Sequence, residues 1–479
     1  MVIFILLTIF LLTTIVLSIF KKINILNKFY LSTFLIITPH LTIFLYLISK
    51  YYNSNNISKI VSILTIIELI LYTSYLYIKL NFFTYKKSKN NTFRLRMLIG
   101  GRKILLSGLY GLIVQVVFYS LYFAYRNNLQ IPKAIFITDI VISILSILFL
   151  ILNGSLKILV SSKRLNIAKR IIAFWSMFIP IINIFSFIYI CYIAKSEYDH
   201  DTYKIDLESV RVESEICKTK YPLILIHGVG FRDLKYFNYW GRIPKDLTKF
   251  GAKVYYGNQE AWGTVAYNSN DIKNKILEVL DKTKCKKVNI IAHSKGGLDA
   301  RYVISKLNMG KYVASLTTIS TPHRGVNIAD YALHFPDSIY KFIAKIVNKI
   351  FSKFGDNNPD FYTASRQFSR SYSKKFNEAV LDDKNVYYQS YASVVSGIFS
   401  DYIVSIPYLL MKLCKEGEND GLVAIDSAKW GEFKGIIRNK KYRGISHGDI
   451  IDLRRYDYKG FDVIEKYVEI VSDLKEKGF

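Results

Sequence analysis

The stretch that decides the fold of this chain reads Lys287-Val288-Asn289-Ile290-Ile291-Ala292-His293-Ser294-Lys295-Gly296-Gly297. Its first six residues form a short, mostly apolar run of the kind found in buried strands. A helical stretch from Lys295 to Leu307 follows at once. We therefore predict a strand that ends in a tight turn, with Ser294 at the start of a helix.

The turn after this strand fits the pattern G-x-S-x-G, with Ala292 at the first small position and Gly296 at the last. Small residues are needed there because the turn brings the strand and helix backbones together. Ser294 would face the positive end of the helix dipole, which favours the negative charge that develops in acyl transfer. The alternative interpretation makes Ser294 a capping residue in an ordinary strand-to-helix turn.

Further apolar runs flank this strand and alternate with helical segments. We expect strands at residues 221–226, 253–256, 313–319 and 386–392, and a helix at 271–282. Strands that alternate with helices form a mostly parallel sheet with helices on both faces. The sequence therefore predicts a doubly wound α/β domain.

An acyl-transfer site also needs an oxyanion hole. The segment His227-Gly228-Val229-Gly230 follows the first strong strand, where the second oxyanion donor of this architecture lies. We expect the main-chain N–H groups of Val229 and Lys295 to form the oxyanion hole.

The site further needs a base and an acid that orients it. Asp420 lies in a turn, Glu418 to Val423, that is expected at the end of a strand, and His447 follows downstream. The order Ser, Asp, His is that of α/β-hydrolases. The other histidines of this half belong to motif backbones, lie beside the membrane half or precede the acid, which favours His447 as the base. Asp426 and Asp449 are rival acids, each less well placed than Asp420.

At this point the sequence resembles a known family, the bacterial triacylglycerol lipases of the α/β-hydrolase superfamily, over roughly residues 219–455. Four motifs carry the resemblance: Ile226-His227-Gly228, Ala292-His293-Ser294-Lys295-Gly296-Gly297-Leu298-Asp299-Ala300-Arg301-Tyr302, Ser320-Thr321-Pro322-His323-Arg324-Gly325 and Asn419-Asp420-Gly421-Leu422-Val423. The resemblance implies that Ser294 is the nucleophile, Asp420 the acid and His447 the base. The chain departs from the family at Lys295, where many members carry Gln or Met.

The resemblance also implies a possible metal. In such lipases a calcium ion often braces the histidine loop through an Asp two residues after the histidine. Asp449 matches that position, and Asp401 is the partner acid that we expect. The alternative is that Asp449 merely caps the helix that runs into Ile450 and Ile451. The chemistry itself requires no cofactor, so any calcium would be structural.

A strongly amphipathic segment lies in an insertion at about residues 326–375. From Ile339 to Phe354 apolar residues recur at helical spacing, while lysines stand at every fourth position from 341 to 353. Helices of this type commonly lie in a membrane interface, and the insertion is where a lid over the active site would belong. The alternative is a helix packed on the core of its own domain.

The first 195 residues have a different composition from the rest. They hold 21 of the 65 Lys and Arg but only two of the 37 Asp and Glu, Glu68 and Asp139. Each of six apolar runs is about 20 residues long, enough to cross roughly 30 Å of hydrocarbon. We therefore expect six transmembrane helices, at residues 1–20, 29–49, 57–80, 104–125, 134–156 and 171–194.

The positive charges between these runs indicate an orientation. The connections after the odd spans carry fifteen Lys and Arg, and those after the even spans carry four. Positive residues favour the cytoplasm, so we expect a multi-pass protein of the cell membrane with its catalytic domain on the outer face. A cleaved signal peptide at residues 1–20 is the rival interpretation, but no positive residue precedes the apolar run.

Two acids lie within the expected spans. Glu68 and Asp139 are functional suspects by position, although a structural hydrogen bond for Glu68 and an interfacial position for Asp139 are the simpler interpretations. The positive charges follow a membrane pattern, so nucleic-acid binding is not expected. The four cysteines show no metal-ligand spacing.

The sequence thus predicts a six-span module at 1–195, a juxtamembrane linker at 196–218 and an α/β-hydrolase domain at 219–479. The expected function is a membrane-anchored serine esterase or lipase that cleaves acyl esters of lipids through an acyl-enzyme. Two alternatives remain: a catalytically silent domain on a transporter or scaffold, and an acyltransferase with the same triad. Nothing in the sequence indicates an oligomeric state.

Overall fold

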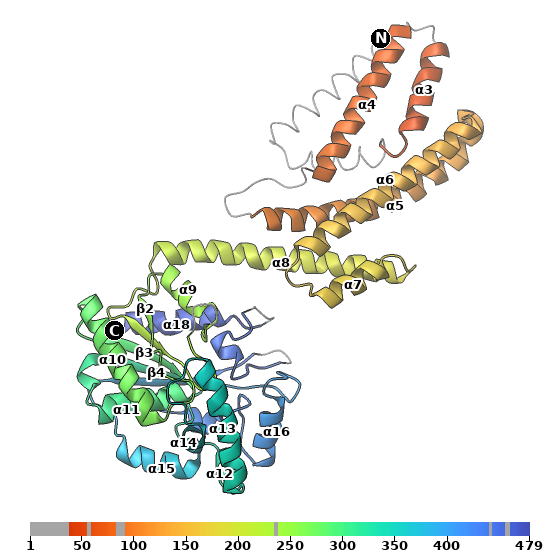
Figure 1. Ribbon diagram of the computed structural model, residues 1–479. Helices are drawn as coiled ribbons and strands as arrows, with labels where there is room; N and C mark the ends of the chain where they lie inside the picture. Colours follow the sequence, from red (N-terminus) through yellow and green to blue (C-terminus); the bar gives the residue numbers. More distant parts are fainter. Residues whose placement is uncertain (1–37, 55–58, 83–91, 234–237, 440–442, 456–459) are drawn as a thin grey trace. The chain divides into compact units, whose positions relative to one another are not determined.

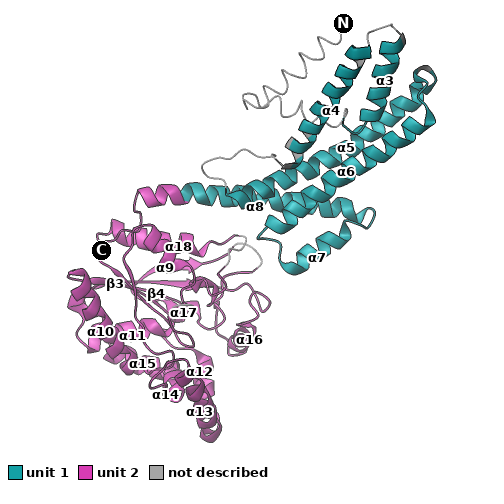
Figure 2. Ribbon diagram, turned by 45° about the horizontal axis from the view of Figure 1, so that its top comes forward, with its two compact units in different colours: residues 1–207 teal, residues 208–479 magenta. Residues whose placement is uncertain are grey.

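The computed structural model describes residues 38–54, 59–82, 92–233, 238–439, 443–455 and 460–479. The chain divides into two compact units, residues 1–207 and 208–479 (Figure 2). The boundary falls inside the segment 196–218 that we expected as a linker. Much of this segment is helical, because helix α8 runs from Ile182 to Glu213.

The described part of the first unit is built from helices (Figure 1). They are α3 (Leu41–Ser54), α4 (Lys59–Phe82), α5 (Phe93–Leu129), α6 (Lys133–Ser161), α7 (Ile167–Ser176) and the first part of α8. Helices α5 and α6 lie side by side and are joined by three residues. They approach closely at glycines, since a side chain on Gly154 of α6 would lie 2.5 Å from the main-chain nitrogen of Leu105. Glycine at this position therefore permits the tight α5–α6 hairpin.

Helices α5 and α6 are the two helices of the described residues that are long and apolar enough to cross a membrane. They contain the expected spans 104–125 and 134–156. Among the described residues, two of the six expected spans are therefore found as helices of this kind. The span at 1–20 and most of that at 29–49 lie outside the described residues. Helix α4 occupies most of the range expected for the third span and carries one charged residue, Glu68, between its terminal lysines Lys59 and Lys79.

The span expected at residues 171–194 is wrong, because two helices share that range. Helix α7 ends at Ser176 and α8 begins at Ile182. Pro180 lies between them, and a proline has no N–H to continue a helix. The next residue, Ile181, has a left-handed backbone with φ of 68°. Hydrophobicity continues across this break, whereas the helix does not.

Asp139 is fully buried and serves as a hydrogen-bond acceptor between segments. It receives bonds from His40 Nδ1 and Thr42 Oγ1, each over 2.8 Å, and from Tyr119 of α5 over 3.1 Å. These bonds join the beginning of α3 to α5 and α6. The structure therefore gives Asp139 a buried structural role instead of the interfacial position that we expected. Glu68 lies half-buried in α4.

The second unit is built on one six-stranded sheet in which every pairing is parallel. Its strand order is β2-β1-β3-β4-β5-β6. The strands are β1 (Leu223–Ile226), β2 (Val254–Tyr256), β3 (Val288–His293), β4 (Val313–Ile319), β5 (Tyr387–Ser393) and β6 (Glu432–Ile437). The predicted parallel sheet is confirmed, and β6 adds an edge strand that we did not expect.

Helices cover both faces of this sheet (Figure 1). Along β1 alternate side chains point to opposite faces, so Leu225 packs with α9 (Ile243–Lys249) and α18 (Val463–Glu476). Its neighbours Ile224 and Ile226 pack with α10 (Val265–Thr283) and α11 (Lys295–Lys306). The remaining helices are α12 (Asn327–Ala332), α13 (Asp337–Lys353), α14 (Phe361–Arg366), α15 (Arg370–Ala379), α16 (Ser405–Leu413) and α17 (Ile425–Ala428). Helices α12 to α15 form the insertion between β4 and β5.

Candidate active site

Ser294 lies in a strained turn between β3 and α11. Its backbone has φ of 53° and ψ of −131°, a conformation that L-residues rarely adopt. A side chain on Gly296 would overlap the carbonyl oxygen of His227, and one on Gly297 would overlap the side chain of Thr321. The small residues after the serine are therefore required by close packing, as the sequence predicts. The turn presents Ser294 at the carboxyl end of the central strand, where its side chain is 7% exposed.

The loop after β1 lies directly against this serine. A side chain on Gly228 would lie 2.8 Å from Ser294 Cβ and 3.3 Å from Ser294 Oγ. The main-chain N–H of Val229 follows in the same loop. Lys295 occupies the first position of α11, where a main-chain N–H has no partner within its own helix. The two segments that carry the expected oxyanion donors thus both adjoin Ser294.

Asp420 and His447 are joined side chain to side chain. His447 Nδ1 donates to Asp420 Oδ2 over 2.8 Å, and the His447 main-chain N–H donates to the Asp420 carbonyl over 3.0 Å. Asp420 Oδ1 also accepts from the main-chain N–H of Val423 over 2.8 Å. Burial raises the pKa of the Asp420 carboxyl, but His447 and the hydrogen bonds outweigh it and lower that pKa below its usual value. Asp420 therefore stays ionised and fixes the orientation of the His447 ring.

The two rival acids have other partners. Asp426 is exposed on α17 and pairs with Lys429 over 2.7 Å. Asp449 begins a short 3₁₀ helix and pairs with Arg443 over 3.1 Å. Neither bonds to His447, so the structure brings Asp420 alone of the three acids to the histidine.

His293, the residue before Ser294, lies beside the ring of His447. The ring of His293 lies 4.4 Å from that of His447, centroid to centroid. No hydrogen bond joins Ser294 to His447 among the described residues, and such bonds often form only when substrate is bound. His293 Nδ1 shares a 2.7 Å hydrogen bond with the hydroxyl of Tyr239. Burial, and then the nearby His447, hold the pKa of His293 well below its usual range, so this ring remains neutral.

The chain is similar to known lipases over part of its length. The model of the palmitoyl protein thioesterase family matches residues 222–387. Triacylglycerol lipase 2 of Saccharomyces cerevisiae is 29% identical over 270 residues, which cover 52% of this chain and 78% of that protein. A triacylglycerol lipase of Pseudarthrobacter phenanthrenivorans is 42% identical over 124 residues, which cover 24% of this chain and 36% of that protein. The mature lipase BlEst2 of Bacillus licheniformis has a TM-score of 0.39 at 21% identity and covers 53% of this chain and 92% of that one.

The sequence matches support a lipase or esterase hydrolase of the α/β-hydrolase type. This chain spans about a third of the length of the bacterial relative, 36%. The matched family segment contains β1 to β4 and the serine turn, and it ends at the first residue of β5.

The chain accommodates Lys295, the residue after Ser294, by a buried ion pair. Lys295 Nζ donates to Asp299 Oδ1 over 2.6 Å, and Asn268 donates to the other oxygen of that carboxylate over 3.2 Å. Burial lowers the pKa of Lys295 and raises that of Asp299 to about 6, and in each case the partner's charge partly offsets the effect of burial. The side chain of Lys295 therefore points into the protein, while its main-chain N–H remains at the serine.

Sequence reasoning missed the side chains that support this site. The Lys295–Asp299 pair has a local signal, because oppositely charged residues four apart on a helix face each other. No local pattern points to Tyr239, because it lies 54 residues before His293 in the sequence. Ser393, which donates to Asp420 Oδ2 over 3.4 Å, likewise comes from the end of a distant strand.

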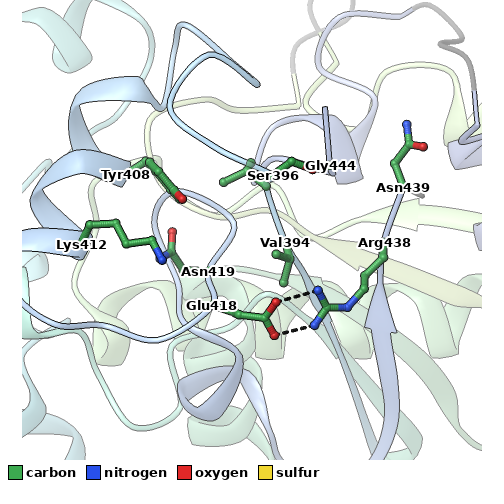
Figure 3. Close-up of a pocket in the computed structure, with 10 residues that line it drawn as sticks. Val394, Ser396, Tyr408, Lys412, Glu418, Asn419, Arg438, Asn439 and Gly444 are labelled. Carbon is green, nitrogen blue, oxygen red and sulfur yellow. Dashed lines mark hydrogen bonds and ion pairs between the residues drawn. The ribbon is translucent and has the colours of Figure 1, made fainter. Parts of the chain in front are cut away.

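A small polar cavity lies behind the turn that carries the acid (Figure 3). Its volume is about 220 Å³, and its lining includes Asn419, the neighbour of Asp420. Glu418 and Arg438 form a two-pronged ion pair at its wall, over 2.7 and 2.5 Å. Ser294 and His447 are not among its lining residues, so this cavity is separate from the catalytic groups.

The amphipathic segment forms helix α13 and keeps much of its apolar face exposed. Phe342 is 65% exposed and Phe354, just beyond the helix, is 61% exposed. Ala344 is buried, and Phe351 packs on the ring of Trp262 at 6.1 Å. A helix packed on its own core would bury most of this face. The structure instead leaves a large apolar stripe in solvent.

Proposed function

We propose that this chain is a membrane-anchored serine hydrolase that cleaves acyl esters of lipids. The observation that carries this proposal is the pairing of a buried, ionised Asp420 with His447, beside a serine held in a strained turn. A strained backbone is retained where its surroundings enforce it, and such strain clusters at active sites. A silent domain would have no reason to keep both features.

In this proposal Ser294 attacks the ester carbonyl while His447 takes the serine proton. The main-chain N–H groups of Val229 and Lys295 donate to the oxyanion that forms. His447 then gives its proton to the leaving alcohol, which departs and leaves an acyl group on Ser294. Water attacks this acyl-enzyme in the second step, again with His447 as base. Asp420 keeps the imidazole in the required tautomer throughout.

The exposed apolar surface supports lipid as the substrate class. Besides α13, the segment before α16 exposes Phe399 and Tyr402, and the start of α16 exposes Ile406. Lysines at positions 341, 345, 349 and 353 border the apolar stripe of α13. Such a surface suits contact with an anionic bilayer. We therefore propose that α13 acts as a lid whose apolar face meets lipid.

Helices α5 and α6 support the proposed membrane anchor. The positive charges between the apolar runs, fifteen against four, place the basic stretch at residues 157–170 in the cytoplasm. We propose that the chain crosses the membrane once more within α7 and α8, which brings the catalytic domain outside the cell. A membrane-impermeant protease added to intact cells should then digest the C-terminal domain. Digestion only after lysis would overturn this orientation.

A thioester is a second candidate substrate, because the matched family model is that of palmitoyl protein thioesterases. The same serine attack serves both substrates, since each presents an acyl carbonyl with a leaving group. Parallel assays on a p-nitrophenyl ester and on an acyl thioester of equal chain length would separate the two preferences. Faster release of product in the presence of an added alcohol would indicate acyl transfer to that alcohol.

The nucleophile is tested with full-length protein in detergent and a soluble p-nitrophenyl ester. We expect Ser294→Ala and His447→Ala each to lower kcat by about a thousandfold or more, with the double variant little worse, because triad members act as a unit. A fluorophosphonate probe should label the wild type and fail to label Ser294→Ala. Ser352→Ala, at an exposed serine, is the matched control. Wild-type turnover in Ser294→Ala would show that the nucleophile assignment is wrong.

A further inference from the structure

The two acids expected at a calcium site lie around Ser446, the residue before His447. Ser446 Oγ donates to Asp401 Oδ2 over 2.5 Å and accepts from the main-chain N–H of Asp449 over 3.1 Å. The main-chain N–H of Ser446 in turn donates to Asp449 Oδ2 over 3.1 Å. Asp449 therefore holds the backbone of Ser446 and Asp401 holds its side chain, immediately next to the proposed base.

Each of these carboxylates also faces an arginine. Arg443 donates to Asp449 Oδ1 over 3.1 Å, and Arg454 donates to Asp401 Oδ1. The acid side chains are 1% and 2% exposed, and those of the arginines are 16% exposed. A buried carboxylate needs a compensating charge. Here one guanidinium supplies that charge for each acid.

These surroundings do not fit a calcium ion. Calcium takes six to eight oxygen ligands, chiefly carboxylates, carbonyls and water. Both oxygens of Asp401 and of Asp449 already accept hydrogen bonds, from Ile403, Arg454 and Ser446 in one case and from Arg443 and Ser446 in the other. Across the described residues there is no group of three or more His, Cys, Asp or Glu that could hold a metal.

One of the arginines, Arg454, also ties the histidine loop to a distant segment. Arg443 and Arg454 stand on either side of the loop that carries His447. Asp401 comes from the segment between β5 and α16, 53 residues before Arg454. The Arg454 guanidinium lies 4.8 Å from the ring of Tyr402, next to Asp401. Arg443 thus braces the loop internally through Asp449, and Arg454 anchors its far end to Asp401.

We propose that Arg443 and Arg454 are positioning residues that brace the His447 loop in place of a metal ion. Each guanidinium is fixed, planar and always charged, so it can hold a carboxylate through directed hydrogen bonds. The loop then keeps its geometry in the absence of calcium. This inference rests on the proposed function only in taking His447 as the catalytic base.

The first test removes the charges in the full-length protein. We expect Arg454→Met and Arg443→Met to lower kcat on a soluble ester by about 10- to 100-fold, as small displacements of catalytic groups do, with little change in KM. Arg454→Lys should recover part of the loss because it keeps a positive charge. Lys284→Met, which breaks an exposed ion pair with Asp281 at the end of α10, is the control. Wild-type kcat in both Met variants would overturn the proposal, and if Arg454→Met fails to fold, wild-type kcat in Arg443→Met would do so.

The second test measures directly whether activity and stability depend on calcium. Wild-type activity and melting temperature should be the same in EGTA and in millimolar CaCl₂. Activity lost on chelation and restored by CaCl₂, or a melting temperature raised by CaCl₂ but not by MgCl₂, would overturn the proposal. A wild type without esterase activity would count against the proposed function instead, and the melting temperatures would still decide whether calcium binds.

Discussion

Lys295 Nζ lies 2.6 Å from Asp299 Oδ1, and both side chains are almost completely buried within the first turns of α11. The pair begins at the residue directly after the proposed nucleophile. The ion pair therefore helps to position helix α11, whose first residue carries an expected oxyanion donor. Any substitution of Lys295 keeps its main-chain N–H, so the side chain can be tested apart from that donor.

We expect Lys295→Met to destabilise the protein by about 3 to 5 kcal/mol, because it leaves a buried carboxylate without its partner. The double variant Lys295→Met with Asp299→Leu should recover most of this loss, since replacing a buried pair by apolar groups is often neutral. Thermal unfolding of the full-length protein measures both. A single variant as stable as the wild type would show that the pair is not coupled to stability.

Close packing at the serine turn predicts that adding one methyl group there destabilises the protein. Gly296→Ala should lower both the melting temperature and the esterase activity, because the new Cβ would overlap the carbonyl oxygen of His227. Gly397→Ala is the matched control, since a Cβ there would meet no atom within 4 Å. Equal behaviour of the two variants in thermal unfolding would contradict the packing argument.

Three buried histidines predict how stability depends on pH. Burial, as the largest cause, lowers the pKa of His227 to about 4 and those of His293 and His323 well below 6.5. At a pH between the pKa of such a histidine in the folded protein and its pKa in the unfolded chain, the unfolded chain binds more protons than the folded protein. The free energy of unfolding is therefore highest above the pKa that histidine has in the unfolded chain. It falls as the pH is lowered from there towards about 4, the pKa of folded His227. Each histidine contributes up to about 1.4 kcal/mol per pH unit.

Melting temperatures measured from about pH 7 down to about pH 5 test this expectation. The wild type should melt at progressively lower temperature, and His323→Gln should show a shallower dependence on pH. His323 hydrogen-bonds to Thr318 over 3.0 Å and makes no contact with the proposed triad. An unchanged slope in the variant would mean that another group controls the acid sensitivity.

Because the apolar face of α13 is exposed, we expect a substitution on it to reduce activity by an amount that depends on the physical form of the substrate. Phe342→Asp should reduce activity on lipid vesicles far more than on a dissolved short-chain ester, because it removes an apolar contact with lipid and adds a charge repelled by an anionic surface. Asn348→Asp is the matched control, since it adds the same charge without removing apolar surface. Equal losses on both substrates, with a lower melting temperature, would favour a packed helix over a lid.

Several features of the site follow from short stretches of sequence. The strand, turn and helix around Ser294 are specified by an apolar run followed by small residues, which are local constraints on the backbone. The parallel sheet follows from the alternation of strands with helices. The order of Ser294, Asp420 and His447 along the chain could be recognised without coordinates, and the structure joins the last two.

Hydrophobicity by itself gave the wrong picture at residues 171–194. Composition is continuous across Pro180, but the hydrogen bonding of a helix is not, so one expected span becomes two helices. The edge strand β6 was missed for a related reason. Its sequence, Glu432 to Ile437, contains two charged residues and a glycine among the apolar ones, and its strand conformation depends on pairing with β5.

The sequence by itself therefore determined the sheet type, the serine turn and the identity of the acid and base candidates. Only the tertiary structure decided that Asp401 and Asp449 face arginines, and that Tyr239 supports His293. The physical reason is the range of the interactions. Backbone turns and apolar periodicity are set by neighbours along the chain, whereas a buried charge takes its partner from whichever segment the fold brings beside it.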